Sequence, residues 1–278
     1  WKKESIMKTR EKKWHILFFI IILLQIFPLI YMLSISLKSM DQVFSEPLKL
    51  IPSVITFENY KHIWNNVPII RYIWNTFFIS AMVTFGKIIT SIMAAYVMTY
   101  KEFKGKKIVY SMILITLFVP FTVTMIPNYL TISKLGILDT SFGVILPQLA
   151  DALGILLMMQ NMRGIPKSLL EVAKIDNISE TRTLVHLIIP MIKNSIIAMG
   201  ILFFINSWNE YFWPLIILSS KENYTLSLAL QMFISSEGGN NWGITMAIAG
   251  MTIIFPIILY IFCQRMIMTS FVKSGIKG

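Results

Sequence analysis

The stretch RGIPKSLLEVAKIDNISETRTLVHLIIP, residues 163–190, is a charged and amphipathic segment that separates two long apolar runs. Its Pro166 suits the first position of a helix, where a missing N–H costs nothing. Asn177 can adopt the left-handed conformation that ends such a helix, and Ser179 suits the N-cap of a second helix that reaches Pro190. The stretch therefore predicts two short helices joined by a tight turn, a rigid projection suited to docking on a soluble partner.

The rest of the 278-residue chain is too apolar for a water-soluble domain. Hydrophobic residues make up 55% of it and charged residues only 14%, against roughly 25% charged residues in soluble domains. Crossing a bilayer takes about 20 apolar residues. Six segments are long enough: Ile16–Leu37, Ile69–Thr99, Ile108–Leu130, Phe142–Asn161, Met191–Ser219 and Trp242–Met268. We expect an all-α polytopic membrane protein with six transmembrane helices, kinked where proline falls inside them. The first segment is too long for a cleaved signal sequence and is expected to be retained.

The basic residues indicate the orientation of these helices. With the N-terminus inside the cell, the cytoplasmic segments hold eighteen Lys and Arg residues, and the segments on the other side hold six. Cytoplasmic loops of membrane proteins carry this excess, so the net charge of +11 reports orientation and gives no support to nucleic-acid binding. We expect a multi-pass protein of the bacterial inner membrane with both termini cytoplasmic. Its expected parts are a cytoplasmic segment 1–15, a transmembrane domain 16–268 and a cytoplasmic tail 269–278.

Residues 171–190, EVAKIDNISETRTLVHLIIP, resemble the EAA motif of bacterial ABC importer permeases, which reads EAA-x-x-DGA followed by an apolar stretch and LP. Glu171, Ala173, Asp176 and Pro190 match the motif at its spacing. Asn177 stands where the motif has glycine, and asparagine is the substitute that best tolerates an unusual backbone angle. In the resembled family this loop is a coupling helix that sits in a cleft of the ATPase subunit. The resemblance assigns that contact to Glu171, Val172, Ala173, Asp176 and Asn177.

Four further stretches resemble the MalG-like carbohydrate branch of that family. They are TFENYKHIW, FVPFTVTMIPNYLTISKLGILDTSFGVILPQLA, SWNEYFWPLIIL and the terminal FVKSGIKG. The resemblance implies the type I ABC importer permease fold and the import of a sugar or oligosaccharide. It also implies an ATPase dimer, a second homologous permease (MalF-like) and an extracellular or periplasmic solute-binding protein as partners. The chain has no G-x-x-x-x-G-K-[ST] sequence, so we expect it to be non-catalytic and without a cofactor, ATP and Mg²⁺ being bound by the partner ATPase.

Polar residues inside membrane spans are costly and therefore mark candidate sites. Those that we assign to a substrate pathway are Asn75, Asn128, Gln148, Asp151, Trp208, Asn209 and Glu210. Amides and carboxylates can bind sugar hydroxyls, while Trp208, Tyr211 and Trp213 offer aromatic faces. The same polar groups could instead bind neighbouring helices. For Lys87 three roles stay open: reaching toward the interface, pairing with an acidic residue, or attracting a phosphate.

Other classes of protein fit the sequence less well. His15, His62 and His186 fall in three different regions, so the chain offers no cluster for a membrane enzyme and no metal site. The single Cys263 excludes an internal disulfide. A purely structural scaffold would leave the EAA-like segment unexplained. A secondary transporter would be active alone in liposomes, driven by an ion gradient without ATP. Glycerol-3-phosphate permeases belong to the resembled branch, and GKIITSIMAAY with Lys87 looks somewhat like theirs, so the substrate stays open between a sugar and a polyol phosphate.

Overall fold

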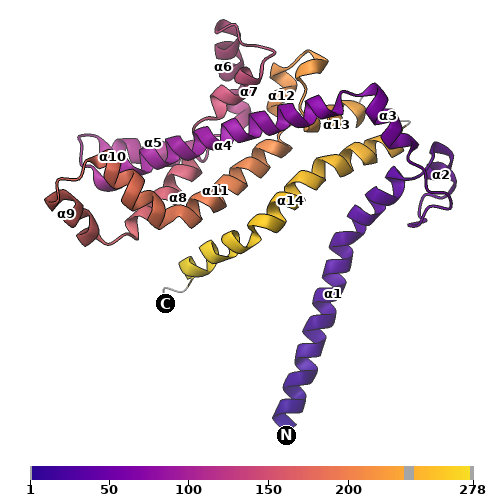
Figure 1. Ribbon diagram of the computed structural model, residues 1–278, viewed down its shortest axis with the longest axis horizontal. Helices are drawn as coiled ribbons and strands as arrows, with labels where there is room; N and C mark the ends of the chain where they lie inside the picture. The colour runs from indigo at the N-terminus through magenta and orange to yellow at the C-terminus, as the bar shows by residue number, and fades with distance from the viewer. Residues whose placement is uncertain (1, 235–240, 276–278) are drawn as a thin grey trace. The chain divides into compact units, whose positions relative to one another are not determined.

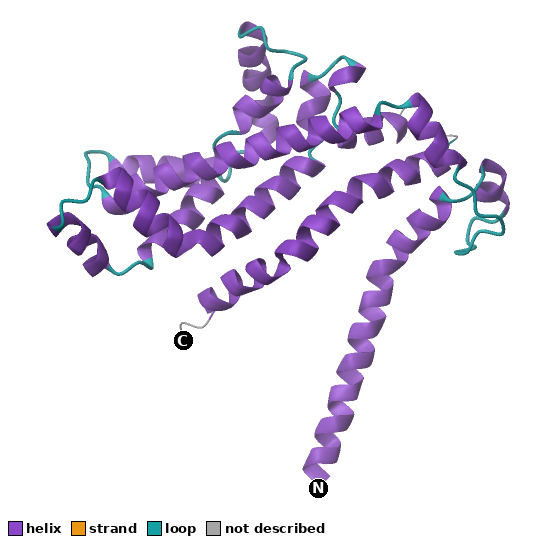
Figure 2. Ribbon diagram, in the orientation of Figure 1, coloured by secondary structure: helices purple, strands orange, loops and turns teal. Residues whose placement is uncertain are grey.

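The computed structural model describes residues 2–234 and 241–275, and within them the side-chain surroundings of residues 14–234 and 241–264. These residues form helices and loops and no strand (Figures 1 and 2). The helices are α1 (Lys2–Ser36), α2 (Met40–Ser45), α3 (Glu58–Asn66), α4 (Ile69–Tyr100), α5 (Lys106–Thr116), α6 (Phe121–Lys134), α7 (Ser141–Ile145), η1 (Leu146–Gln148), α8 (Ala152–Arg163), α9 (Lys167–Ile175), α10 (Glu180–Thr183), η2 (Leu184–Ile188), α11 (Ile189–Asn209), α12 (Phe212–Ile217), η3 (Lys221–Asn223), α13 (Leu226–Met232) and α14 (Trp242–Gly275). The all-α class predicted from the sequence is confirmed.

The chain divides into two compact units. One unit combines the residues up to Ile69 with Leu230–Ile254. In it most of the stretch TFENYKHIW lies in α3, and α3 packs its apolar side through the fully buried Ile63. Asn59 of α3 donates to the carbonyls of Ser36 and Lys38, each at 2.9 Å. These two bonds fix α3 to the end of α1.

The second unit comprises Ile70–Ala229 together with the residues from Phe255 onward. Its core lies between α4, α8 and α11, which contribute buried residues such as Ala95, Met158 and Phe203. Gly154 lets α8 approach closely, since a Cβ there would lie 2.5 Å from Oγ of Ser91 and 2.6 Å from Cζ of Phe203. Every element that positions the EAA-like segment belongs to this unit.

Four helical stretches are long and apolar enough to cross a membrane, and the number rises to six if two bent helix pairs each count as one span. The continuous ones are Trp14–Ser36, Ile69–Tyr100, Glu180–Asn209 and Trp242–Gln264. The expected third span, Ile108–Leu130, is instead broken, and α5 and α6 meet at 103°. Pro120 precedes α6, and a proline disfavours helical geometry in the residue before it. The break is therefore far sharper than the kink that was predicted.

The fourth expected span, Phe142–Asn161, is also bent, by 47° between η1 and α8. The fifth, Met191–Ser219, ends earlier than predicted, because α11 stops at Asn209 and the short α12 follows. Helix α1 already includes residues 2–15, and α14 continues through residues 269–275 of the expected tail. Residues 276–278 of that tail lie outside the described residues.

Helix α11 also begins differently from the prediction. The second helix of residues 163–190 does not stop at Pro190 but continues through η2 into α11, so that Glu180–Asn209 is one 30-residue helical stretch. The stretch passes through a π-helical turn at Leu184–Ile188, directly before Pro190. Pro190 has no N–H to donate to the carbonyl four residues earlier, and its ring crowds that carbonyl. A locally wider turn accommodates the proline without ending the helix.

Candidate functional site: the EAA-like projection

The projection formed by residues 163–190 begins with α9. Pro166 is the N-cap of α9 and not its first residue. The helix starts at Lys167, one residue later than predicted. Asn177 adopts the left-handed conformation, with φ of 53°. The N–H of Asn177 donates to the carbonyl of Lys174 at 3.1 Å, and the N–H of Ile178 donates to that of Ala173 at 2.9 Å. This bond pair is a Schellman motif, so the predicted end of the helix is confirmed.

The turn passes directly into the next helix. Ser179 is the N-cap of α10, as predicted, although its side chain makes no capping hydrogen bond. Its carbonyl accepts hydrogen bonds from the N–H of Thr183 at 2.9 Å and from the Thr183 hydroxyl at 3.2 Å. Only four residues, 176–179, separate the two helices, so α9 cannot move far independently of the long helix that follows it.

Contacts with the core hold the projection at both ends. Ile165 before α9 and Ile188 in η2 are buried in the core cluster, and Leu170 of α9 packs against it. The hydroxyl of Tyr100 donates to the carbonyl of Met162 at 2.6 Å, directly before the projection. A displacement of α9 would therefore be transmitted to α4, α8 and α11.

An ion pair adds a further tie. Lys101, which follows α4, pairs with Glu180 of α10. The hydrogen bond with Glu180 raises the pKa of Lys101. This pair joins the end of α4 to the start of the 30-residue helix, and neither residue was singled out in the sequence. The charged residues around the motif do not indicate that Glu180 pairs with a lysine 79 positions away.

The residues predicted to meet the ATPase divide by exposure. Glu171, Asp176 and Asn177 are exposed, and Val172 is 54% exposed. Ala173 is only 6% exposed, because it lies on the side of α9 that faces α10. The exposed residues are available to a partner, while Ala173 lines the space between α9 and the helix that follows it.

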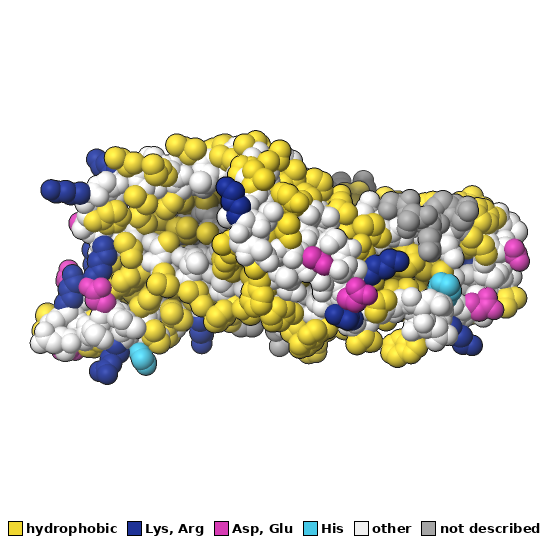
Figure 3. Space-filling view, turned by 90° about the horizontal axis from the view of Figure 1, so that it is seen from above, with side chains coloured by type: hydrophobic (Ala, Val, Ile, Leu, Met, Phe, Trp, Pro, Cys, Tyr) yellow, Lys and Arg dark blue, Asp and Glu magenta, His cyan; other side chains and the backbone are white. Residues whose placement is uncertain are grey.

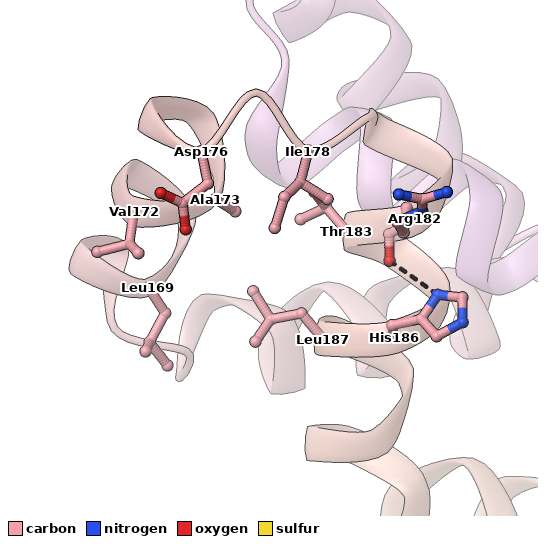
Figure 4. A pocket seen from close by; sticks show the side chains of 9 residues that line it. All are labelled: Leu169, Val172, Ala173, Asp176, Ile178, Arg182, Thr183, His186 and Leu187. Carbon is pink, nitrogen blue, oxygen red and sulfur yellow. Dashed lines mark hydrogen bonds between the residues drawn. The ribbon is translucent and has the colours of Figure 1, made fainter.

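A cavity of about 440 Å³ lies between α9 and the helix formed by α10 and η2 (Figure 4). Leu169, Val172 and Ala173 line it from α9, and Ile178 and Leu187 extend from the opposite wall. The remaining lining residues are polar or charged: Asp176, Arg182, Thr183 and His186. Nδ1 of His186 donates to the carbonyl of Arg182 at 3.3 Å. An apolar hollow with a charged rim is suited to receiving a side chain of a docked protein.

Two charged residues inside the spans, Lys87 and Asp151, are paired with each other. Nζ of Lys87 in α4 lies 3.3 Å from Oδ2 of Asp151, and the two side chains are 16% and 25% exposed. Asp151 also caps α8, its Oδ1 accepting the N–H of Gly154 at 2.8 Å. Of the three roles left open for Lys87, the structure shows pairing with an acidic residue. The ammonium also lies 5.2 Å from the centre of the Phe203 ring.

Two other predicted pathway residues bind backbone carbonyls. Asn75 of α4 donates to the carbonyls of Glu222 at 2.9 Å and Tyr224 at 3.0 Å. Gln148 of η1 donates to the carbonyl of Val144 at 3.0 Å. In this conformation both amides hold the fold together. Whether they also meet a substrate stays a prediction.

The aromatic and acidic residues at and after the end of α11 are mostly buried in the second unit or hydrogen-bonded to its backbone. Trp208 is 1% exposed and stacks on Phe255, with ring centres 4.5 Å apart. At the start of α12, Glu210 accepts the N–H groups of Phe212 at 2.9 Å and Trp213 at 3.3 Å. Trp213 is also buried, and its indole N–H donates to the carbonyl of Val144 at 3.2 Å. Their aromatic faces are thus occupied by protein in this conformation.

The amides of Asn128 in α6 and Asn209 at the end of α11 differ from the others. Within residues 14–234 and 241–264, neither side chain makes a hydrogen bond. Asn128 is partly exposed and Asn209 is exposed. Of the predicted pathway residues, these two keep free polar groups.

Sequence reasoning missed the role of Asp139, which lies between α6 and α7. Oδ1 of Asp139 accepts the N–H groups of Ser219 at 2.9 Å and Ser220 at 3.0 Å, and its other oxygen accepts the Ser220 hydroxyl. Its own carbonyl accepts a hydrogen bond from Asn223 at 2.6 Å. Burial acts to raise the pKa of Asp139, but the hydrogen bonds from Ser220, Ser219 and Asn223 outweigh it and lower the pKa to about 2. Asp139 therefore joins two loops that are eighty positions apart in the sequence.

Comparisons with known proteins agree with this architecture over almost the whole chain. An arabinooligosaccharide transport system permease protein of Halalkalibacterium halodurans is 31% identical over 265 residues, covering 94% of each chain. A sn-glycerol-3-phosphate transport system permease protein of Yersinia pestis is 32% identical over 267 residues, covering 94% of this chain and 95% of the relative.

Solved structures show the same fold. A chain of a bacterial ABC transporter involved in the import of the acidic polysaccharide alginate superposes with a TM-score of 0.81 at 26% identity, covering 90% of this chain and 94% of that one. A second chain, from an alginate ABC transporter, superposes with a TM-score of 0.67 at 14% identity and shows the fold alone. The type I permease fold that the sequence predicted is thus confirmed.

The family comparison covers most of the second unit, including the EAA-like projection, and part of the first unit. Residues 86–270 match the model of a protein family described as the binding-protein-dependent transport system inner membrane component. Together with the several apolar helices, this match makes the chain a multi-pass membrane protein. The chain belongs to the family of binding-protein-dependent transport system inner membrane components.

Proposed function

We propose that this chain is a membrane permease subunit of an ATP-driven ABC importer that brings a sugar or oligosaccharide into a bacterial cell. The observation that carries the proposal is the projection itself. Its α9 exposes Glu171, Val172, Asp176 and Asn177, while core contacts and the Lys101–Glu180 pair hold it rigidly. A rigid projection with an exposed face transmits force, whereas a flexible loop would absorb it.

The energy for transport comes from a partner. The chain has no Walker A sequence, so it is a non-catalytic subunit, and an ABC ATPase dimer binds the ATP and Mg²⁺. The ATPase contacts α9 and the rim of the 440 Å³ cavity. Its closure on ATP shifts α9, and the shift passes to α4, α8 and α11 through the shared core. Such a change follows from the different affinities of the partner for the two states.

Two further partners complete the importer. The family takes its name from dependence on a binding protein, which supports an extracellular or periplasmic solute-binding protein that delivers the substrate. A second, MalF-like permease packs against this chain. Many large apolar side chains of the second unit are exposed, including Phe85, Met93 and Met112, and lipid and a second permease together cover such surface.

The expected topology places the projection in the cytoplasm. Lys and Arg side chains gather at the end of the second unit that carries α5, α9 and α10, at the left of Figure 3. Under the positive-inside rule this end faces the cytoplasm, with both termini on the same side and the transmembrane domain spanning residues 16–268. A tag inserted after Lys167 should be labelled only after the cells are opened. Labelling of that tag on intact cells contradicts this orientation.

The relatives and the pairing of Lys87 together indicate the class of substrate. The relatives include permeases named for arabinooligosaccharides and for sn-glycerol-3-phosphate, and a structural neighbour imports alginate. A phosphate substrate needs a free cation, but Lys87 is paired with Asp151. We therefore favour a sugar or oligosaccharide over a polyol phosphate. We place Asn128 and Asn209 on its path, since both amides are free among the described residues.

Uptake by the reconstituted importer tests the proposal. The chain, its partner permease, the ATPase and the binding protein are placed in proteoliposomes with ATP inside. Accumulation of a labelled oligosaccharide that stops without ATP supports the proposed function. Accumulation of glycerol-3-phosphate, with no uptake of sugars, changes the substrate class. Uptake by this chain alone, driven by an ion gradient, identifies a secondary transporter and contradicts the importer.

A further inference from the structure

A second cavity, of about 850 Å³, lies in the second unit where α4 ends, α5 begins and α8 ends. Met98 and Met159, both almost fully buried, form part of its apolar wall. Its polar lining includes Lys106, Lys107 and Arg163, together with Glu102 as the acidic residue. The cavity is separate from the one beside α9, with which it shares no lining residue.

The charges of this cavity are unevenly compensated. Nζ of Lys106 donates to Oε1 of Glu102 at 2.9 Å and to the carbonyl of Lys101 at 2.7 Å. Lys107 and Arg163, in contrast, make no side-chain hydrogen bond or ion pair within the described part of the chain. Two uncompensated cations therefore face the same hollow from two different helices. They are complementary to an anionic group, and the N-terminal end of the α5 dipole adds to the same field.

The surroundings indicate what carries the anion. The apolar span formed by α4 ends at Tyr100, and the bent pair that contains α5 begins at Lys106, so the cavity lies at the level where apolar spans give way to charged residues. On α5, Ile108, Met112 and Ile115 are 63%, 60% and 61% exposed. Their spacing places them on one face of the helix. The cationic mouth thus continues directly into an exposed apolar stripe.

We propose that this cavity binds the phosphate headgroup of an anionic phospholipid, with Lys107 and Arg163 on the phosphate and the acyl chains along Ile108, Met112 and Ile115. Basic pockets between transmembrane helices on the cytoplasmic side bind such headgroups. The apolar stripe argues for a lipid over a soluble anion, because a free phosphate gains nothing from exposed isoleucine and methionine. The lipid links the ends of α4, α5 and α8, next to the start of the EAA-like projection.

The test uses the assembled importer, purified in detergent and titrated with phosphatidylglycerol under native mass spectrometry. The double variant Lys107→Gln, Arg163→Gln should bind this lipid about thirtyfold more weakly, since each basic residue near a membrane surface contributes about a factor of five. Lys107→Gln alone should lose about fivefold, and its exposed, unpartnered side chain leaves the fold intact. The control is Lys104→Gln, which removes a charge from the same loop outside the cavity lining.

Three competitors identify the source of the anion. Phosphatidylcholine, inorganic phosphate and glycerophosphoglycerol, the headgroup without acyl chains, should each fail to displace phosphatidylglycerol. Equal affinity in the double variant and in Lys104→Gln overturns the proposal. Displacement by inorganic phosphate also overturns it and assigns the cavity to a soluble anion. A cross-link from a cysteine at position 107 to a partner subunit overturns it in favour of a protein contact.

Discussion

The carboxylate of Asp151 pairs with Lys87 and caps α8 at the same time. Its Oδ2 lies 3.3 Å from Nζ of Lys87, while its Oδ1 accepts the N–H of Gly154 at 2.8 Å. The residue thus caps one helix and neutralises a charge on another. An acidic residue that does both is costly to replace.

Three substitutions separate these two roles. Lys87→Met leaves the carboxylate without its cation and should cost about 1–3 kcal/mol, less than the roughly 3–5 kcal/mol of a fully buried pair, because both side chains are partly exposed. Asp151→Asn keeps a capping oxygen and loses only the pair. Asp151→Ala loses both and should cost about 1 kcal/mol more than Asp151→Asn. Thermal unfolding of the purified complex measures the stability of each variant. Equal losses of stability in Asp151→Asn and Asp151→Ala would contradict the capping role.

The left-handed Asn177 predicts a graded response to substitution. Asn177→Gly should leave stability and transport unchanged or slightly improved, because glycine adopts a positive φ without strain. Asn177→Val should cost more than 1 kcal/mol, since left-handed geometry costs ordinary residues about 1–2 kcal/mol and β-branched ones more. The readout is the ratio of substrate transported to ATP hydrolysed in proteoliposomes. Full coupling in the valine variant would falsify the claim that this turn sets the position of α9.

The low pKa of Asp139 predicts a dependence on acidity. Because the pKa is lowered from 3.8 to about 2 in the folded protein, the ionised carboxylate stabilises the fold fully above pH 3.8, and this contribution disappears as the pH falls toward 2. The difference in unfolding temperature between the wild type and Asp139→Asn should therefore shrink between pH 5 and pH 2. Asp41→Asn serves as the control. A difference that stays constant with pH shows that the charge of Asp139 is not involved.

Much of the fold could be predicted from local signals. The apolar runs gave the approximate positions of the spans, and Asn177 and Ser179 gave the boundaries of the turn, because these depend on hydropathy and on backbone preference. The 103° break before α6 could not be foreseen, since a proline within a span produces a kink in one environment and a break in another. The continuation of the helix through Pro190 depends on a π-helical turn, which no sequence pattern indicated.

The contacts between residues far apart in the chain could not be predicted from the sequence either. Asp139 and Ser220, or Lys101 and Glu180, meet only because the helices between them fold back. Trp208 was assigned to the substrate path because of its residue type, yet it is buried against Phe255. Residue type alone does not show whether an aromatic face points to a path or to a neighbouring helix.

Charge reversal on α9 should uncouple the importer. Glu171→Lys or Asp176→Lys places a cation on the exposed face, and we expect at least a tenfold loss of ATP-dependent uptake with normal membrane insertion. Glu58→Lys, the same change on the exposed side of α3, is the control. Uptake at the wild-type rate in both α9 variants contradicts the proposed contact.

The most direct test of the central claim is a cross-link between α9 and the ATPase. Replacing Cys263, the single cysteine of the chain, with serine permits one new cysteine at position 171, with a cysteine at position 58 as the control. The account predicts that a short bifunctional reagent joins position 171, but not position 58, to the ATPase subunit in native membranes, and that ATP changes the yield. A complex that imports substrate normally while position 171 never cross-links to the ATPase would contradict the account.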